Sequence, residues 1–265
     1  MTKIYFFSGT GNNLWSAKKI AQLIEAHDPE NFCELHNIGS VMKNEDLISD
    51  LTIEAEAVVI VFPSYAYGLP LVVRRFVEKA VFKTPYIASF VSFGSSPMGT
   101  LGAMKRILKT KGVEKLFFGR IPAVENYLAM FGPPKPATVA HRVFLQKEAT
   151  EEAARAVIER RVNKVNTFTP FSSFVTFLLY CGLKIFYKHY RLGKDCNGCG
   201  TCEKICPVSA IVMKDGRPVF TEKCEHCQGC INLCPLRAIQ FGRVKHGTPG
   251  YCHPEIELQD LFRKM

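Results

Sequence analysis

The sequence predicts an α/β domain, with an open and doubly wound parallel sheet of five strands, followed by a small α+β domain. Over residues 1–165, short apolar runs alternate with helical patterns, an order that builds a parallel sheet covered by helices on both faces. Loops rich in glycine and hydroxyl residues follow several of these runs. Beyond residue 195, a run of four cysteines recurs 28 residues later, so one small unit is used twice.

The apolar runs give the order of the elements. The strongest predict buried strands over residues 3–7, 57–62 and 86–93, and weaker runs at 31–36 and 113–118 complete five. Helical spacing predicts helices over residues 14–26, 72–81, 100–109 and 147–165. In an open sheet of this kind, ligands bind beyond the carboxyl ends of the strands.

The loop after the first strand is a candidate phosphate site, since glycines and small hydroxyl residues let backbone amides surround a phosphate at a helix N-terminus. Its residues are Ser8, Gly9, Thr10, Gly11, Asn12 and Asn13. No lysine stands where a Walker A motif needs one, which disfavours nucleoside triphosphate hydrolysis. For this loop alone, a plain strand–helix turn is the alternative.

Two further loops complete a resemblance. The loop after the third strand contains Pro63, Ser64, Tyr65, Ala66, Tyr67 and Gly68, and the loop after the fourth contains Phe93, Gly94, Ser95, Ser96, Met98 and Gly99. Together with the first loop, they make residues 1–165 resemble the flavodoxins. The resemblance implies the strand order 2-1-3-4-5 and an FMN site at the switch point of the sheet. It implies that Tyr65 or Tyr67 stacks on the flavin ring, whereas the small, polar third loop leaves one ring edge open.

The cysteine run is the most specific signal in the chain. Its two copies are Cys196, Cys199, Cys202 and Cys206, and Cys224, Cys227, Cys230 and Cys234, and a proline follows each copy. This is the bacterial ferredoxin pattern for two [4Fe–4S] clusters, in which the fourth cysteine of each run ligates the other cluster. The predicted ligand sets are therefore Cys196, Cys199, Cys202 and Cys234 for one cluster, and Cys206, Cys224, Cys227 and Cys230 for the second.

Other uses of these cysteines are weaker explanations. Structural zinc takes four ligands per ion and usually separates two Cys-x-x-Cys pairs, so this run would leave a surplus. A disulfide framework belongs to secreted proteins, and nothing here indicates secretion. We expect Cys33, Cys181 and Cys252 to be small buried hydrophobic residues. Because eight cysteines already supply every cluster corner, we expect His226 to be exposed.

The N-terminus has no signal peptide, and oxygen-sensitive clusters favour a reducing compartment, so we expect a cytoplasmic protein. The formal net charge is +10, and two clusters with their thiolates reduce it to about +6. Nothing resembles a nucleic-acid-binding motif. A basic electron carrier fits an acidic redox partner or an anionic membrane surface.

A hydrophobic segment separates the two domains. Residues 165–183 carry no charge, and Lys184, Lys188 and Arg191 follow. Polar residues and Pro170 weaken a transmembrane span, so the segment is foremost predicted to be a helix packed between the domains. Its aromatic stripe and basic flank leave a second alternative open, a peripheral membrane contact through residues 168–191.

The predicted domains are residues 1–165, a linker at 166–194, the cluster domain at 195–245 and a tail at 246–265, to which we assign no chemistry. The whole chain resembles the flavodoxin–ferredoxin fusion proteins of anaerobic microbes. The resemblance implies an electron-transfer iron–sulfur flavoprotein that relays electrons between two [4Fe–4S] clusters and FMN, to or from a protein redox partner. The alternative is an FMN-dependent reductase of a small molecule, such as a quinone, nitro or unsaturated compound, that receives electrons from its own clusters. No side chains mark a catalytic acid or base.

Overall fold

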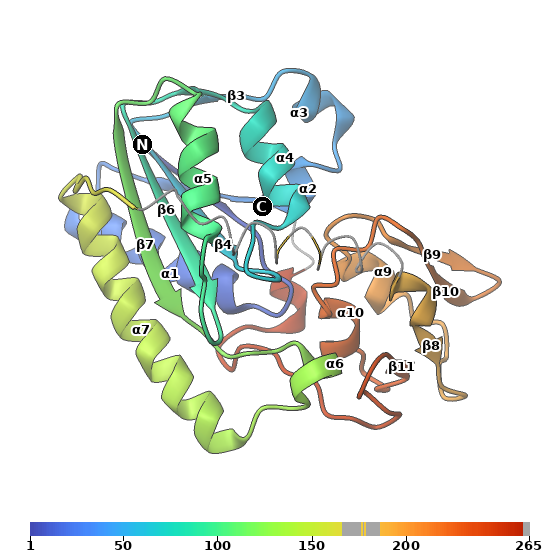
Figure 1. Cartoon of the computed structure of the whole chain (residues 1–265). Helices are drawn as coiled ribbons and strands as arrows, with labels where there is room; N and C mark the ends of the chain where they lie inside the picture. The colour runs from blue at the N-terminus through green and yellow to red at the C-terminus, as the bar shows by residue number, and fades with distance from the viewer. Residues whose placement is uncertain (166–175, 177, 179–185, 262–265) are drawn as a thin grey trace.

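The computed structural model describes residues 1–165, 176, 178 and 186–261 (Figure 1). Its central sheet has five parallel strands in the order β2-β1-β4-β6-β7. These strands are β1 (Thr2–Phe6), β2 (Cys33–Asn37), β4 (Ala57–Pro63), β6 (Tyr86–Phe93) and β7 (Lys115–Pro122). Among these five, the chain order is 2-1-3-4-5, so the predicted flavodoxin-like sheet is confirmed.

Helices cover both faces of this sheet because side chains along each strand alternate between the faces. On one face, α1 (Asn12–His27) and α7 (Pro136–Ile158) pack over a core that includes Val59 and Val61. On the other face, α2 (Ile38–Val41), α4 (Leu71–Lys79) and α5 (Thr100–Lys109) pack over a core that includes Ile60 and Phe62. Both cores are almost free of solvent, as expected for a buried parallel sheet.

Shorter elements complete the N-terminal domain. A four-residue helix, α6 (Leu128–Phe131), follows β7, and α3 (Glu45–Ser49) follows α2. A two-stranded parallel pair joins β3 (Thr52–Glu54) to β5 (Val81–Lys83) beside the main sheet. The predicted helix 72–81 therefore ends two residues early, because Val81 already belongs to β5.

The predicted helix over residues 147–165 is wrong at both ends, since α7 runs from Pro136 to Ile158. Proline at the first helical position loses no hydrogen bond there and starts the helix early. At the other end, Arg160 has a positive φ of 51°. Asn163 then pairs with Phe118 of β7 through two hydrogen bonds of 2.9 Å, one to each backbone group. These contacts hold the chain against the sheet edge and prevent a longer helix.

The cysteine-rich domain is built from two similar halves beside the carboxyl edge of the sheet (Figure 1). Its helices are α9 (Thr201–Ile205) and α10 (Gly229–Asn232), each within one cysteine run. Its strands form two antiparallel pairs: β8 (Arg191–Leu192) with β11 (Ile239–Gln240), and β9 (Ile211–Lys214) with β10 (Arg217–Phe220). Single-turn 3-10 helices stand at Tyr187–His189 and Leu258–Leu261.

Most of the hydrophobic segment lies outside the described residues, and Cys181 lies there too. Within the segment, the Thr176 hydroxyl donates a hydrogen bond of 3.1 Å to the Ala66 carbonyl oxygen. One point of this segment therefore touches the loop after β4. None of the helices that the structure describes has the length and apolar character needed to cross a membrane.

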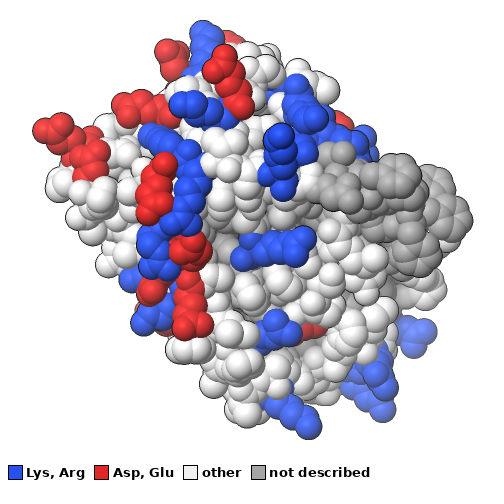
Figure 2. All heavy atoms as spheres, turned by 60° about the vertical axis from the view of Figure 1, so that its left-hand side comes forward, with Lys and Arg blue, Asp and Glu red and all other residues white. Residues whose placement is uncertain are grey.

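The surface beside α7 and β7 carries charges of both signs. Figure 2 shows this side of the molecule, where lysine and arginine side chains interleave with aspartate and glutamate. At the C-terminal end of α7, Arg155 and Arg161 both pair with Glu152, and Arg161 also pairs with Glu159. Exposed pairs of this kind contribute little stability, and this face presents no field of a single sign.

Candidate functional site

Four cysteines, the outer set, surround one cavity at the far side of the cysteine-rich domain. They are Cys196, Cys199, Cys202 and Cys234, the group that the sequence pattern assigns to one cluster. Met213, Pro218 and Leu236 add an apolar wall to the same cavity. Cys199 is exposed, so this cavity reaches the protein surface.

The other four cysteines, the inner set, are Cys206, Cys224, Cys227 and Cys230. Cys206 and Cys230 are buried, and Cys224 and Cys227 are half-buried. Burial raises the pKa of the Cys227 thiol, and the nearby thiols of Cys206 and Cys224 raise it further. Burial likewise raises the pKa of Cys230, with contributions from Cys227, Cys224 and Cys206 and, last, from Cys202 of the outer set. These mutual effects place the four sulfurs in one neighbourhood, where iron must displace the thiol protons.

Backbone amides point at several of these sulfurs. The Ala210 amide donates to Cys206 Sγ over 3.1 Å, and its counterpart in the repeat, the Ala238 amide, donates to Cys234 Sγ over 3.4 Å. The His226 amide donates to Cys224 Sγ over 3.4 Å. Hydrogen bonds to cluster sulfurs are one of the factors that set a reduction potential.

The donors fit two [4Fe–4S] clusters, because each group holds four thiols and amide donors reach both groups. Among the described residues, no three His, Cys, Asp or Glu side chains are placed to hold a single metal ion. A cluster needs its four thiolates spread around a cube rather than gathered on one ion.

An aromatic stack closes one side of the inner set. The Tyr190 ring lies between Phe220 and Phe241, with centroid distances of 4.4 and 4.5 Å, and its hydroxyl lies 3.9 Å from Cys224 Sγ. Burial raises the pKa of Tyr190 strongly, and the inner thiols raise it further, so its hydroxyl stays protonated. The expectation of an exposed His226 is wrong: its exposed fraction is 3%, because the ring packs against Tyr190 and Phe241.

The three loops predicted to hold flavin all lie at the carboxyl edge of the sheet (Figure 1). In the second loop, Tyr65 and Gly68 exchange two backbone hydrogen bonds, and the Tyr65 ring packs edge-on against Phe7 at 6.0 Å. The Ser64 hydroxyl is bonded to the hydroxyl of Thr100, which ties this loop to α5. Tyr67 is partly exposed beside it.

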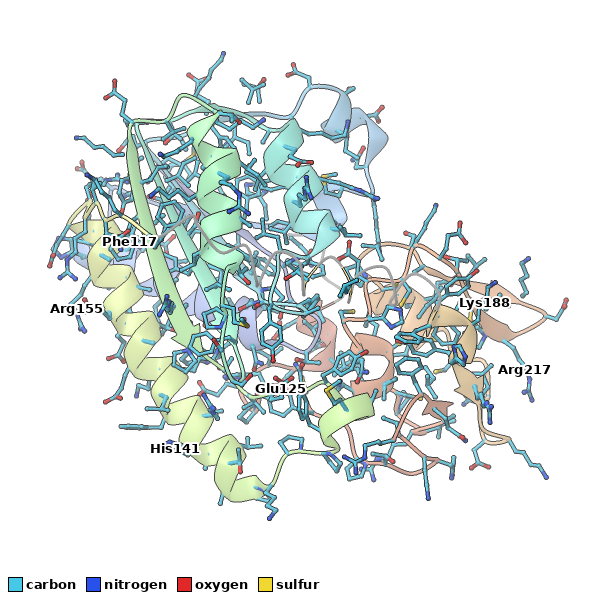
Figure 3. The ribbon with its side chains drawn as sticks, viewed as in Figure 1. Phe117, Glu125, His141, Arg155, Lys188 and Arg217 are labelled. Carbon is cyan, nitrogen blue, oxygen red and sulfur yellow. The ribbon has the colours of Figure 1, made fainter. Side chains whose placement is uncertain are left out.

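In the third loop, Met98 is also partly exposed. Gly94 lies against the carboxylate of Glu125, and a Cβ at this glycine would clash with that side chain. Glu125 follows β7 and lies between the sheet and α6 (Figure 3). Its carboxylate also accepts hydrogen bonds of 3.1 Å from the amides of Asn126 and Tyr127.

The inner cysteine loop, residues 224–230, packs directly onto this edge. A Cβ placed on Gly9 would lie 3.2 Å from the Cys227 carbonyl oxygen, and one on Gly229 would lie 2.8 Å from the Gly9 carbonyl oxygen. At Gly229 the backbones are too close for any Cβ, and at Gly9 a Cβ would be tight, so the two backbones approach closely where both residues are glycine. A second contact joins the domains nearby, where the Lys43 ammonium donates to the carbonyl of Cys206.

Glu225, between two inner ligands, caps α4 of the other domain. Its carboxylate accepts hydrogen bonds from the Leu71 and Val72 amides at 2.8 and 2.6 Å. Pro70 at the start of α4 supplies no side-chain cap, so this carboxylate satisfies amides that the helix leaves open. Burial raises the pKa of Glu225 to about 7, against the opposing effect of the two amides and Arg75.

Residues 250–261 of the tail cover the first loop. The Tyr251 hydroxyl donates to Asn12 Oδ1 over 2.7 Å, and the His253 amide donates to the Thr10 carbonyl over 2.9 Å. The His253 ring stacks on Trp15 of α1 with a centroid distance of 4.9 Å. The sequence indicates no role for this tail, whereas in the structure the tail covers the candidate phosphate loop.

A comparison with known families identifies the second domain. Residues 195–239 match the 4Fe-4S dicluster domain. The chain is a flavodoxin-like domain joined to a dicluster ferredoxin domain. No curated protein matches the chain in sequence.

Solved structures resemble the flavodoxin-like part at low identity. An azoreductase from Bacillus anthracis is 14% identical, with a TM-score of 0.41, and the match covers 60% of this chain and 100% of that one. The two-electron reduced flavodoxin of Megasphaera elsdenii is 21% identical, with a TM-score of 0.37, and covers 59% of this chain and 100% of its own. A flavodoxin from Streptococcus pneumoniae TIGR4 is 14% identical, with a TM-score of 0.37 and coverages of 60% and 99%.

The first loop, unlike the cysteines, does not fit its predicted group in this arrangement. Several of its polar groups already have partners within the chain: Ser8 Oγ accepts from the Gly11 amide, Thr10 Oγ1 accepts from Asn126, and the side-chain amides of Asn12 and Asn13 donate to the carbonyls of Val124 and Phe7. The one buried polar side-chain atom of this loop without a partner, Asn13 Oδ1, is an acceptor, which a phosphate oxygen does not pair with. Thr10 and Asn13 are each 2% exposed. A flavin phosphate would have to displace both these partners and the tail.

Several residues where the two domains and the tail meet are not predicted by the sequence analysis. Asn126 and Tyr127 stand at the carboxyl end of the fifth strand, a position that could have included them, but a proline-rich loop is typical of a plain surface connection. For Glu225, Tyr251 and His253 the sequence carries no local signal. The expectation for Cys33 and Cys252 is also wrong in degree, because both thiols are only half-buried.

Proposed function

We propose that this chain is an electron carrier that exchanges electrons with a protein partner at its outer cluster. The main support is that the two cysteine sets differ in how accessible they are to a partner protein. The outer cavity includes the exposed Cys199, whereas two of the inner cysteines are buried and residues 224–230 face the other domain. Bound clusters would supply one-electron chemistry, and the protein supplies the thiolates, the amide donors and the shielding of the inner site.

The partner is expected to be acidic. Lys188 and Arg217 lie at the outer end of the dicluster domain, away from the sheet (Figure 3). Lys204 and Lys214 are exposed. The pKa of the Cys199 thiol is lowered, foremost by its hydrogen bonds with Thr201 and also by the positive charge of Lys204. Opposite charge on a partner would speed the encounter and orient it toward the outer cavity.

The first test is anaerobic purification with iron, sulfide and flavin assays on one sample. We expect about eight irons and eight sulfides per chain and an electron paramagnetic resonance signal of reduced [4Fe–4S] centres. Stoichiometric zinc in a colourless protein would overturn the proposal. The proposal would also be overturned if the fully iron-loaded protein could not be reduced by any one-electron donor.

The relay that includes FMN is a second candidate. One observation favours it, although the relay requires the first loop to exchange its present hydrogen-bond partners for a flavin phosphate. Cys227 of the inner set and the Tyr65 hydroxyl both lie against Gly9, at the predicted flavin loops. FMN there would supply one- and two-electron chemistry, and the reductase alternative has the same requirement. Stoichiometric flavin supports the relay, and turnover of quinones or nitro compounds supports the reductase.

A peripheral membrane contact through residues 168–191 and a cytoplasmic location remain predictions. Co-sedimentation of the purified protein with anionic vesicles at low salt tests the first. Absence of binding at low ionic strength, where basic segments attract such vesicles most strongly, would contradict it.

A further inference from the structure

We propose that the switch point of the flavodoxin-like domain is an internal docking site, which holds the inner cluster loop and the tail in place of a flavin. This inference goes beyond electron transfer, because it assigns a structural task to a site whose sequence pattern resembles a cofactor loop.

The first step is the fit between the tail and the loop. Gly11 has a φ of 94°, and a Cβ there would lie 3.1 Å from Ile256 and 3.2 Å from His253. Ile256 is 7% exposed and packs in the same core as Leu14 and Trp15 of α1. The tail therefore lies against the backbone of the loop as part of the core, rather than resting on its surface.

The second step is the connection from the tail to the dicluster domain. Asn232 of α10 accepts a hydrogen bond of 2.9 Å from the Tyr251 amide, and its own side-chain amide donates to the Asn126 carbonyl at 3.1 Å. Asn126 in turn donates to Thr10. The tail, α10, Asn126 and the first loop thus form one continuous network of buried and partly buried hydrogen bonds, in which every link joins residues distant in the sequence.

The third step is competition. A phosphate in the first loop needs hydrogen-bond donors directed at it. Here the Gly11 backbone amide is directed at Ser8 Oγ, and the side-chain amides of Asn12 and Asn13 are directed at carbonyls. Tyr251 approaches the Asn12 oxygen, and Thr10, Asn12 and Asn13 are all buried. Phosphate binding would break this network and uncover the backbone contact between Gly9 and residues 224–230. Docking and flavin binding therefore exclude each other.

The direct test measures flavin in the holoprotein. Anaerobically purified protein, loaded with iron and sulfide, is mixed with FMN and passed through gel filtration, and FMN fluorescence is titrated in parallel. We expect less than about one-tenth FMN per chain to be retained, and no saturable quenching at micromolar protein. One FMN per chain, bound with a Kd near or below about 1 µM, overturns the inference. The iron assay on the same sample judges the proposed function separately.

A second test asks whether the tail closes the loop. Hydrogen exchange of the holoprotein is compared with that of Ile256→Asp, and Glu257→Gln, an exposed neighbour, is the matched control. We expect exchange of amides in residues 8–16 to rise at least tenfold in Ile256→Asp, with α5 and β6 unchanged, and no rise in the control.

Tyr251→Phe is a milder variant that separates loss of the tail contact from general misfolding, since it removes only the hydroxyl bonded to Asn12. It should raise exchange around Asn12 by a few-fold without changing the iron content. If residues 8–16 keep their protection in both tail variants while the rest of the fold is intact, the docking proposal fails.

Discussion

The outer and inner cysteine sets follow one sequence motif but lie in different surroundings. The outer set includes the exposed Cys199 and an apolar cavity wall. The inner set lies against Gly9 of the flavodoxin-like domain. Two further contacts join it to that domain: Lys43 donates to the carbonyl of Cys206, and the first amides of α4 donate to Glu225. The repeat therefore sets which cysteines can ligate iron, and the neighbouring domain sets access and polarity. We infer that the two clusters differ in reduction potential, because solvent exposure and hydrogen bonding both tune it.

The largest effects should come from removing ligands, which tests the crossed arrangement itself. Cys234→Ala should abolish the outer cluster although it belongs to the second run, and Cys206→Ala should abolish the inner one although it belongs to the first. Each variant should retain about four of eight irons. Iron analysis with paramagnetic resonance separates the cases, because only the remaining outer cluster should respond quickly to added reductants. Identical residual signals in both variants would contradict the assignment.

Glu225 allows the domain junction to be tested without touching a ligand. Glu225→Ala removes the cap of α4 and should cost about 1–2 kcal/mol of unfolding free energy, measured by denaturant titration of the holoprotein. Asn197, at the equivalent place in the outer run, is exposed, and its side chain accepts only a local hydrogen bond of 3.2 Å from the Cys199 amide, with none from the described residues of the other domain. The matched variant Asn197→Ala should change stability by less than about 0.5 kcal/mol. Equal losses in the two variants would remove the contrast between the halves.

The partner-docking face is tested by reversing charge near the outer set. Lys214→Glu and Arg217→Glu should each slow electron exchange with an acidic redox protein several-fold, and the difference should shrink as salt rises. Lys147→Glu on α7 makes the same change on the opposite side of the molecule and should leave the rate within error. Stopped-flow reduction at two ionic strengths measures all three variants. A rate that is independent of all three charges would place docking elsewhere.

The smallest expected effect concerns the tail and pH. Burial lowers the pKa of His253 to about 4, below the ordinary value of 6.5. The unfolded chain therefore binds more protons in this range, so the stabilising contribution is complete above about pH 6.5 and is lost as pH falls toward 4. Between pH 7.5 and 5.5 it should fall by about 1 kcal/mol.

Glu225, whose pKa is raised, has the opposite slope, so wild type alone gives no clear answer. His253→Phe keeps a ring against Trp15 but has no proton to gain. Denaturant midpoints of the two proteins at both pH values isolate the histidine. Parallel pH profiles would show that His253 does not titrate as the burial implies.

The parts of this molecule that the sequence predicted are those that depend on near neighbours. The strands and helices followed from apolar runs and helical spacing, and the two cysteine sets followed from a motif with fixed spacing. The strand order was implied by the resemblance of the loops to those of flavodoxins. The unpredicted parts depend on distant pairs: Glu225 lies 154 residues from Leu71, and Tyr251 lies 239 residues from Asn12. No periodicity or motif encodes such pairs. The resemblance of residues 8–13 to a phosphate loop is a local signal. It carries no information about the tail that covers the loop, because Tyr251 of the tail lies 239 residues beyond Asn12 in the sequence.

The carboxylate of Glu225 has a consequence for the order in which the protein matures. During translation, α4 leaves the ribosome long before the residue that caps it, because 154 residues separate Leu71 from Glu225. Domains generally fold as units from the N-terminus during synthesis. The start of α4 therefore lacks this cap until residues 224–230 have been synthesised and have docked. The second domain in this way supplies the last contacts of a helix that belongs to the first.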